Sequence, residues 1–71
     1  MNNYIMQNIR YLRKKNGWSQ KQLAEITQCS LSTIINWECG INYPTYIPLL
    51  RLEEVFKVSL DDLAHRNMEA E

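Results

Sequence analysis

Residues 18–40, WSQKQLAEITQCSLSTIINWECG, decide how this 71-residue chain folds. Ser19 is followed three residues later by Gln22, which is the spacing of a capping box, in which each side chain accepts a hydrogen bond from the other residue's backbone N–H. Ser30 is a second N-cap, and Gly40 is the residue type that most often ends a helix in the left-handed conformation. The stretch therefore predicts two short helices, joined by the tight turn Thr27-Gln28-Cys29.

Apolar residues recur at helical spacing on both sides of this stretch. Before it, residues 4–16 place Ile5, Ile9 and Leu12 along one stripe. After it, residues 46–56 carry a second apolar face. Both segments are therefore predicted to be helices whose apolar sides meet in a common core.

A single small domain is expected, because 71 residues lie close to the lower size limit for one stable core. We expect it to span residues 1–65 and to end in a short helix over residues 60–64, with Ser59 as its N-cap. Residues 66–71 are polar and are expected to form a frayed tail. The predicted fold class is all-α, a compact five-helix bundle.

Several functional classes are excluded by what the sequence lacks. Cys29, Cys39 and His65 are too few and too far apart for a zinc site, and both thiols are expected to be reduced. No signal segment or long apolar run is present, so a cytoplasmic protein that does not enter membranes is expected. No nucleophile accompanies His65, and no glycine-rich phosphate loop exists. We therefore expect neither an enzyme nor a cofactor, metal or small-molecule ligand.

Positive charge is concentrated in the first part of the chain, although the whole chain has no net charge. Residues 1–40 contain five basic and two acidic side chains, a balance of +3, and residues 41–71 contain three basic and six acidic ones, a balance of −3. A positive end is what a nucleic-acid-binding domain presents to phosphates. The excess is modest, so weak and salt-dependent non-specific binding is expected.

Two helices joined by a tight turn are the elements of a helix-turn-helix, which offers its second helix to the DNA major groove. Residues 8–64 resemble the lambda-repressor/Cro-like (XRE-type) DNA-binding domains of bacteria and phages. The resemblance implies a five-helix bundle that binds operator DNA, often as a dimer, and regulates transcription. It rests on an ordered set of motifs: Gly17-Trp18-Ser19-Gln20, Leu23-Ala24, Ser30-x-x-Thr33-Ile34, Trp37-Glu38-x-Gly40, Pro44-Thr45 and Val58-Ser59-Leu60-Asp61.

The resemblance also implies roles for residues of the two helices. Leu31, Ser32 and Asn36 match positions that reach base edges. Ser19 matches a phosphate-contacting N-cap. Gln20 matches a glutamine that braces a phosphate and often a side chain of the recognition helix.

Further roles concern the surroundings of these helices. Arg13 and Glu38 match a pair that, in some members, ties the first helix to the end of the third. As an exposed pair it would contribute only about 0–1 kcal/mol to stability. The backbone N–H groups from Gly40 to Asn42 match a loop that grips a phosphate. Given the motif, one or two basic residues of the first helix are expected to approach phosphates, from among Arg10, Lys14 and Lys15.

The chemistry of the third helix predicts which bases it can read. Asn36 is the best reader, because an amide can bond adenine through two hydrogen bonds. Leu31 or Ile35 can contact a thymine methyl group, whereas Ser32 discriminates little. Residues 31–38 contain no arginine or lysine, so the commonest guanine contact is missing. An operator read through A·T pairs and DNA shape is therefore expected.

Some positions depart from the family pattern. Gln28 and Lys57 stand where glycines are usual, and each costs roughly 1 kcal/mol if its φ is positive. Glu53 stands where a small buried residue is common, so that either its side chain points outward or its helix is rotated. Ile41 and Tyr43 replace basic loop residues, which weakens phosphate binding and exposes apolar surface.

Two functions remain open at this point. The first is a sequence-specific DNA-binding transcriptional regulator, a repressor that binds double-stranded operator DNA as a homodimer. The second is a protein-interaction module, antitoxin-like or anti-repressor-binding, that keeps the fold with weak or no DNA binding. A dimer interface can come from Ile41, Tyr43, Tyr46 and Ile47 together with Leu60 and Leu63, unless the last two only close the core of the monomer.

Overall fold

The computed structural model describes residues 3–70, which form five α-helices and one 3-10 turn, with no strand in that range. The five helices begin and end within one residue of the predicted bounds. The prediction of an all-α five-helix bundle is therefore confirmed. The elements are α1 (Ile5–Lys15), α2 (Gln20–Thr27), α3 (Leu31–Cys39), α4 (Tyr46–Phe56), α5 (Leu60–His65) and η1 (Met68–Ala70).

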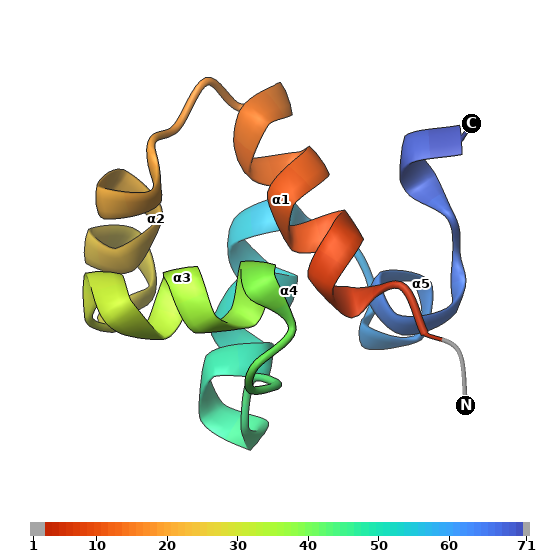
Figure 1. Cartoon of the computed structure of the whole chain (residues 1–71). Coiled ribbons are helices and arrows are strands. Elements are labelled where there is room, and N and C mark those ends of the chain that lie inside the picture. Colours follow the sequence, from red (N-terminus) through yellow and green to blue (C-terminus); the bar gives the residue numbers. More distant parts are fainter. Residues whose placement is uncertain (1–2, 71) are drawn as a thin grey trace.

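The helices surround a single core, with α2 and α3 on one side and α5 with the C-terminal segment on the other (Figure 1). Helix α1 lies between them and packs against α3, α5 and η1, while α4 packs against α2 and α5. Helices α1 and α4 thus both join the two sides of the molecule. Among residues 3–70, no helix combines the length and apolar character needed to cross a membrane.

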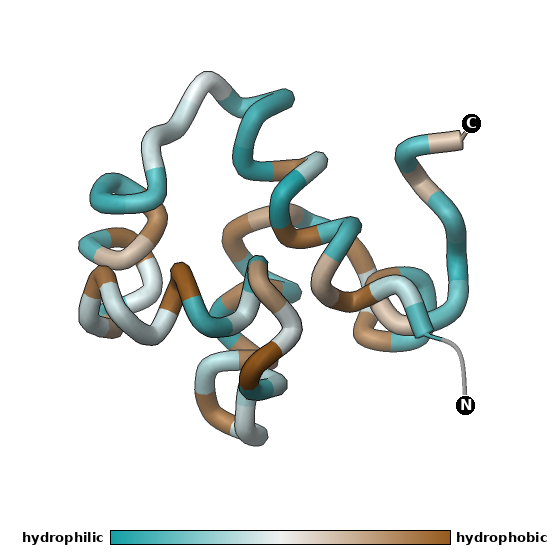
Figure 2. Tube along the Cα trace, in the orientation of Figure 1, coloured by the Kyte–Doolittle hydropathy of each residue, from teal (hydrophilic) through white to brown (hydrophobic). Residues whose placement is uncertain are grey.

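Apolar residues from every α-helix and from η1 meet in the core, and Figure 2 shows them recurring between hydrophilic residues along the helices. Leu63 is fully enclosed, so it closes the core of the monomer, whereas Leu60 is half-buried. Half-buried Trp18 stacks on Phe56, with ring centroids 6.0 Å apart. The core consists of Ile9, Leu12, Leu23, Ala24, Ile34, Trp37, Leu52, Phe56, Leu63 and Met68.

The segment after α5 differs from the frayed tail that the sequence predicts. Met68 is buried in the core, and its N–H donates to the side-chain oxygen of Asn8 at 3.3 Å. The Asn8 amide, itself fully buried, donates to the carbonyls of Leu63 and Arg66 at 2.8 and 2.7 Å. A buried polar group is stable only when it is paired in this way. One asparagine of α1 therefore holds the C-terminal segment in place.

Gln28 and Lys57, which stand where the family usually has glycine, take the left-handed conformation that glycine favours. Gln28 ends α2 with φ 59°, and Lys57 ends α4 with φ 58°. Glu53 is half-buried, and its carboxylate accepts a hydrogen bond from the N–H of Leu60 at 3.2 Å. Its charge therefore lies at the N-terminal end of α5, where an anion is favourable.

Replacing Lys57 by glycine should stabilise the protein. A left-handed backbone costs a residue with a Cβ atom roughly 1–2 kcal/mol. Glycine avoids this strain but has more freedom in the unfolded chain, so the expected net gain in the free energy of unfolding is about 1 kcal/mol. Urea unfolding of Lys57→Gly measures the gain. Lys57→Ala is the control, because alanine keeps the Cβ atom and removes only the charge. Equal stability of the two variants would contradict the assignment of strain to this residue.

Candidate nucleic-acid interface

Helices α2 and α3 both begin at the capping residues that the sequence indicates. The Ser19 hydroxyl accepts from the N–H of Gln22 at 3.0 Å, and the Gln22 side chain accepts from the N–H of Ser19 at 2.8 Å. The Ser30 hydroxyl accepts from the N–H of Thr33 at 3.2 Å. The predicted capping box and second N-cap are therefore confirmed. They fix the start of both helices.

Helix α3 buries one side and exposes the other. Ile34 and Trp37 are enclosed in the core. The residues predicted to reach bases lie on the remaining surface: Leu31, Ser32 and Ile35 are exposed, and Asn36 is half-buried. Their spacing of one, four and five residues places them along a single stripe of the helix. We call Leu31, Ser32, Ile35 and Asn36 the reading stripe.

The reading stripe is uncharged and keeps its hydrogen-bonding capacity. Within residues 3–70, the side chain of Asn36 has no hydrogen-bond partner, so its amide remains available to a base. Leu31 and Ile35 are 44% and 36% exposed. Because they are four residues apart, their side chains are neighbours on the helix surface. The stripe thus combines one amide, one hydroxyl and one apolar pair.

A buried ion pair fixes the C-terminal end of α3 to α1. Arg13 donates through Nε to Glu38 Oε2 at 2.7 Å and through Nη2 to Glu38 Oε1 at 2.9 Å. The two side chains are only 11% and 4% exposed. The pair predicted from the family resemblance is present. The small contribution to stability that was expected of an exposed pair does not apply to this one, because buried charges are screened far less by solvent and salt.

Two further contacts extend this ion pair to the start of α2. The remaining guanidinium nitrogen of Arg13, Nη1, donates to the carbonyl oxygen of Trp18 at 2.9 Å. The amide of Gln20 donates to Glu38 Oε1 at 3.2 Å. Arg13, Glu38, Gln20 and the Trp18 carbonyl together form what we call the bracing network. It joins α1, α3 and the beginning of α2 through two side chains that are almost enclosed.

The side chains predicted to contact phosphates lie next to this network. Ser19, Arg10 and Lys14 are exposed, and Gln20 is half-buried. Arg10 is three residues before Arg13, so it lies on the side of α1 that faces α3. Lys14 follows Arg10 by four residues and extends the same side.

Lys15 belongs to a different surface. Its ammonium group lies over the ring of Tyr11, 5.8 Å from the centroid. Tyr11 is two residues from Arg13, which is about 200° around the helix. Arg10 and Lys14 therefore remain as the phosphate candidates of α1, and Lys15 does not.

The loop after α3 uses its first N–H groups internally. The N–H of Gly40 donates to the carbonyl of Trp37 at 3.2 Å, and the N–H of Ile41 donates to the carbonyl of Asn36 at 2.9 Å. The N–H of Asn42 reaches the same Asn36 carbonyl only at 3.4 Å. The N–H of Asn42 makes the longest of these three hydrogen bonds, so it can most easily donate to a phosphate instead. The N–H groups of Gly40 and Ile41 complete the hydrogen bonding at the end of the helix.

Gly40 stands at a position where a side chain would be strained. Its φ is +79°, and a Cβ atom placed on it would lie 2.9 Å from Met6 Sδ. A larger residue here would adopt a strained left-handed backbone and would displace the end of the Met6 side chain, so glycine is the favoured residue at this helix end.

Sequence reasoning missed one contact that supports the turn between α2 and α3. Arg51 of α4 donates through Nη1 to the carbonyl oxygen of Thr27 at 3.1 Å. That carbonyl lies in the last turn of α2, where helical acceptors lose their partners. An arginine in the fourth helix gives no local signal of such a contact, because 24 residues separate the two groups.

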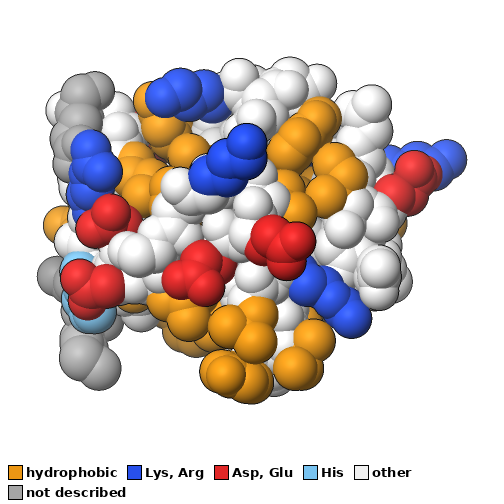
Figure 3. All heavy atoms as spheres, turned by 180° about the vertical axis from the view of Figure 1, so that it is seen from behind, with side chains coloured by type: hydrophobic (Ala, Val, Ile, Leu, Met, Phe, Trp, Pro, Cys, Tyr) orange, Lys and Arg blue, Asp and Glu red, His pale blue; other side chains and the backbone are white. Residues whose placement is uncertain are grey.

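An apolar patch borders the C-terminal end of α3. Its four side chains are 52–68% exposed. Seen from behind, hydrophobic side chains gather along the lower edge of the molecule, below a row of acidic ones (Figure 3). A hollow of about 380 Å³ adjoins it, lined by Thr33, Trp37, Asn42, Tyr43, Thr45 and Pro48. Exposed apolar groups that lie together in this way are typical of interaction surfaces. We call this set the loop patch, and it consists of Ile41, Tyr43, Tyr46 and Ile47.

Comparison with known proteins places this geometry in a known family. A family model described as Helix-turn-helix matches residues 9–63. A segment of 32 residues is 50% identical to the competence pilus inhibition repressor of Acinetobacter baylyi, covering 45% of this chain and 29% of that protein. The crystal structure of a transcriptional regulator from Listeria innocua superimposes with a TM-score of 0.84 at 26% identity, over 90% of this chain and 60% of that one. The chain thus spans less than two thirds of each of these relatives.

Removing the charge of Glu38 should destabilise the protein strongly. Glu38→Gln leaves the Arg13 guanidinium buried beside a neutral amide, which should cost about 2–3 kcal/mol of unfolding free energy. The loss should persist at high salt, because the pair is shielded from solvent. Chemical denaturation measures it. Glu25→Gln, the same change at an exposed position of α2, should alter stability by less than about 0.5 kcal/mol. A similar effect in both variants would contradict the bracing network.

Proposed function

The chain belongs to the helix-turn-helix family, and on this premise we propose that it is a sequence-specific DNA-binding regulator of transcription that acts as a repressor. In this proposal α3 enters the major groove of operator DNA. The observation that carries it is the reading stripe: an uncharged, exposed surface of α3 held at its far end by a buried ion pair. A helix that must fit a groove needs a fixed orientation, and the bracing network supplies one.

Docking on the DNA backbone would come from the groups around the start of α2 and from α1. Ser19 and Gln20 lie at the N-terminal end of α2, where the helix dipole favours a phosphate. Arg10 and Lys14 add two charges on the side of α1 that faces α3. Such contacts set the position of α3 along the duplex but carry no sequence information themselves.

Base recognition would come from the reading stripe. Asn36 can form two hydrogen bonds to an adenine, and Leu31 with Ile35 can enclose a thymine methyl group. Because α3 contains no arginine or lysine, the proposed operator is rich in A·T pairs at the contacted positions. Discrimination against other sequences would also come from the shape of the DNA.

A homodimer would double the contacted DNA. The loop patch lies beside the end of α3, so a twofold axis through it would bring two copies together next to their reading stripes. An aromatic side chain of one copy could enter the hollow that adjoins the patch of the other. To read two half-sites one turn of the duplex apart, the two α3 helices of such a dimer must lie about 34–36 Å from each other. The name of the Acinetobacter relative supports repression as the outcome of binding.

The loop patch also favours a second candidate function, a protein-interaction module that keeps the fold and binds DNA weakly or not at all. A gel shift against random duplexes at low and moderate salt separates the two functions. Binding at low salt that falls steeply with added salt is the result expected of the regulator. Undetectable binding at low salt would contradict it. Selection of bound fragments from random DNA would then give the operator and its half-site spacing.

Asn36→Ala should relax sequence preference. The variant loses the amide that reads adenine, so affinity for the preferred site should fall by about 1–3 kcal/mol while affinity for unrelated DNA stays the same. Gln20→Ala is the comparison, since it should weaken binding without changing which sequence is preferred. Fragment selection with each variant measures both effects. An unchanged preference in Asn36→Ala would show that α3 does not read bases as proposed.

Tyr43→Ser should weaken self-association. The change removes a large exposed side chain from the loop patch, so the dimer dissociation constant measured by analytical ultracentrifugation should rise about tenfold or more. Leu31→Ser removes a side chain of similar exposure from the reading stripe and should leave association unaffected. If the two variants associate equally, the loop patch is not the dimer interface.

A further inference from the structure

The chain enters α3 through a tight turn that contains a strained backbone. Only Gln28 and Cys29 lie between the last residue of α2 and Ser30, the N-cap of α3. Gln28 has φ 59°, a left-handed conformation that is unfavourable for a residue with a Cβ atom. The N–H of Gln28 donates to the carbonyl of Glu25 at 3.2 Å, and the N–H of Cys29 donates to that of Ala24 at 2.8 Å. A strained residue therefore stands directly before the reading stripe.

The side chain of Arg51 supports this turn from another helix. Its Nη1 donates to the carbonyl oxygen of Thr27 at 3.1 Å, and the Cys29 thiol donates to the same oxygen at 3.5 Å. Thr27 is fully buried, so water does not compete for this oxygen. Leu52, the next residue of α4, is fully enclosed in the core. Arg51 therefore reaches the turn from a firmly packed part of α4.

The charge of Arg51 suits this place, because the C-terminal end of a helix is negative. The last turn of α2 contains no basic residue of its own. A guanidinium that donates to a carbonyl of that turn supplies the positive charge, together with a hydrogen bond stronger than one from a neutral donor. Arg51 therefore stabilises the end of α2 in the conformation from which the chain turns into α3.

The start of α3 needs a support separate from the bracing network. Glu38 holds the other end of the helix, and Leu31 stands seven residues before it, which is about 10 Å along the axis. A tilt of about 20° at Glu38 would therefore move Leu31 by about 3.5 Å, close to the spacing of one base-pair step. Such a tilt would place Leu31 and Ser32 against the wrong base pair. Asn36 is only two residues from Glu38 and would hardly move.

We propose that Arg51 is a positioning residue of the reading stripe. Through the Thr27 carbonyl it fixes the start of α3, so that Leu31 and Ser32 face their base pairs, while Arg51 itself contacts no DNA. The inference rests on the proposed function, because it concerns how α3 reads bases. It adds that the two ends of α3 are fixed by different contacts. Loss of Arg51 should therefore alter recognition in one part of the operator and not in the other.

Hydrogen exchange of the protein without DNA tests whether Arg51 holds the turn. In Arg51→Gln, exchange of the Cys29 N–H should accelerate by about tenfold relative to that of Leu12, the effect of losing one hydrogen bond to a charged group. Leu12 belongs to the core, so its exchange corrects for a loss of global stability. Arg51→Lys keeps the charge and a donor, and should restore most of the protection. Equal acceleration at Cys29 and Leu12 would overturn the proposal.

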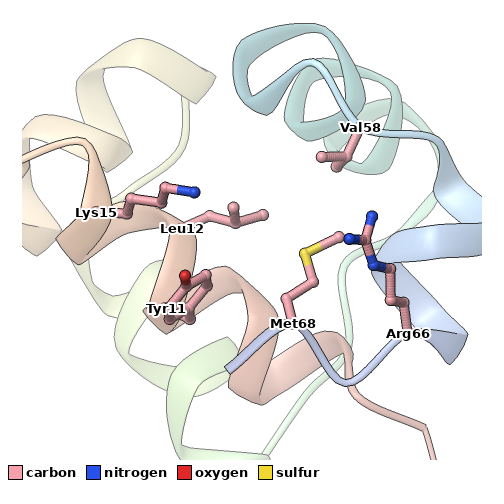
Figure 4. Close-up of a pocket in the computed structure, with 6 residues that line it drawn as sticks. All are labelled: Tyr11, Leu12, Lys15, Val58, Arg66 and Met68. Atoms are coloured by element: carbon pink, nitrogen blue, oxygen red, sulfur yellow. The ribbon is translucent and has the colours of Figure 1, made fainter. Parts of the chain in front are cut away.

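Lys15→Gln is the matched control for the lost charge. Lys15 lines a hollow of about 270 Å³ that opens between the C-terminal half of α1 and the segment after α5, and no residue of α2 or α3 lines it (Figure 4). This variant loses one positive charge, as Arg51→Gln does, but leaves the Thr27 carbonyl with its donor. It should therefore change neither the exchange at Cys29 nor the base preference. The same effect in both variants would mean that only net charge matters, and would contradict the role of Arg51.

Discrimination between DNA sequences tests whether the turn positions the reading stripe. Base pairs of the selected operator are assigned to Leu31 or Asn36 by the loss of preference in Leu31→Ala and Asn36→Ala. A mismatched base pair costs about five- to 150-fold in affinity, and in Arg51→Gln this factor should fall about threefold or more at the Leu31 base pairs and stay the same at the Asn36 base pairs. Unchanged factors at the Leu31 base pairs, or an equal loss at both sets, would overturn the proposal. Failure of the proposed function would instead be seen in the unmodified protein, which would then prefer no sequence.

Discussion

The ion pair between Arg13 and Glu38 is the interaction on which the rest of the structure depends. Arg13 uses all three nitrogens of its guanidinium, two for Glu38 and one for the carbonyl of Trp18. Glu38 in turn accepts from Gln20. Three helices therefore meet at one charged centre that is nearly closed to water. Ions are costly to bury, so the pair is stable only with every partner in place. The pair therefore favours one arrangement of α1, α2 and α3 over others, in addition to any contribution that it makes to stability.

In the proposed complex, different parts of α3 hold the helix in place and read the DNA. Its C-terminal end carries Glu38, which is buried and charged. Its outer surface carries the reading stripe, which is exposed and uncharged. In the proposed complex, the fixed end determines where the helix lies in the groove, and Asn36 with the apolar pair determines which bases are accepted. A reading surface without arginine gains little from electrostatic attraction, so its orientation has to be correct before contact.

The sequence predicted the parts of the fold that depend on neighbouring residues. Capping by Ser19 and Ser30 and the stop at Gly40 are local, so helix bounds could be predicted to within a residue. In the reading stripe, Leu31, Ser32 and Asn36 followed from the family resemblance and Ile35 from the chemistry of contacts to thymine, and the structure places all four together on the surface of α3. Burial could not be predicted in the same way. Burial depends on which distant segments cover a residue, and neighbouring residues do not show this. The Arg13–Glu38 pair was therefore expected to be exposed, and Met68 was expected to lie in a frayed tail. The contact from Arg51 to Thr27 and the hollow beside Lys15 are also products of tertiary packing.

The central claim is that the bracing network sets the orientation of α3 relative to α1. Residual dipolar couplings of backbone amides, measured on the protein without DNA, report that orientation directly. In Glu38→Gln, compared with the unmodified protein, the account predicts that couplings within each helix still fit a regular helix. It also predicts that α3 is reoriented or averaged relative to α1, while α5, anchored through Asn8, keeps its place. An α3 whose orientation to α1 is the same in both proteins would contradict the account.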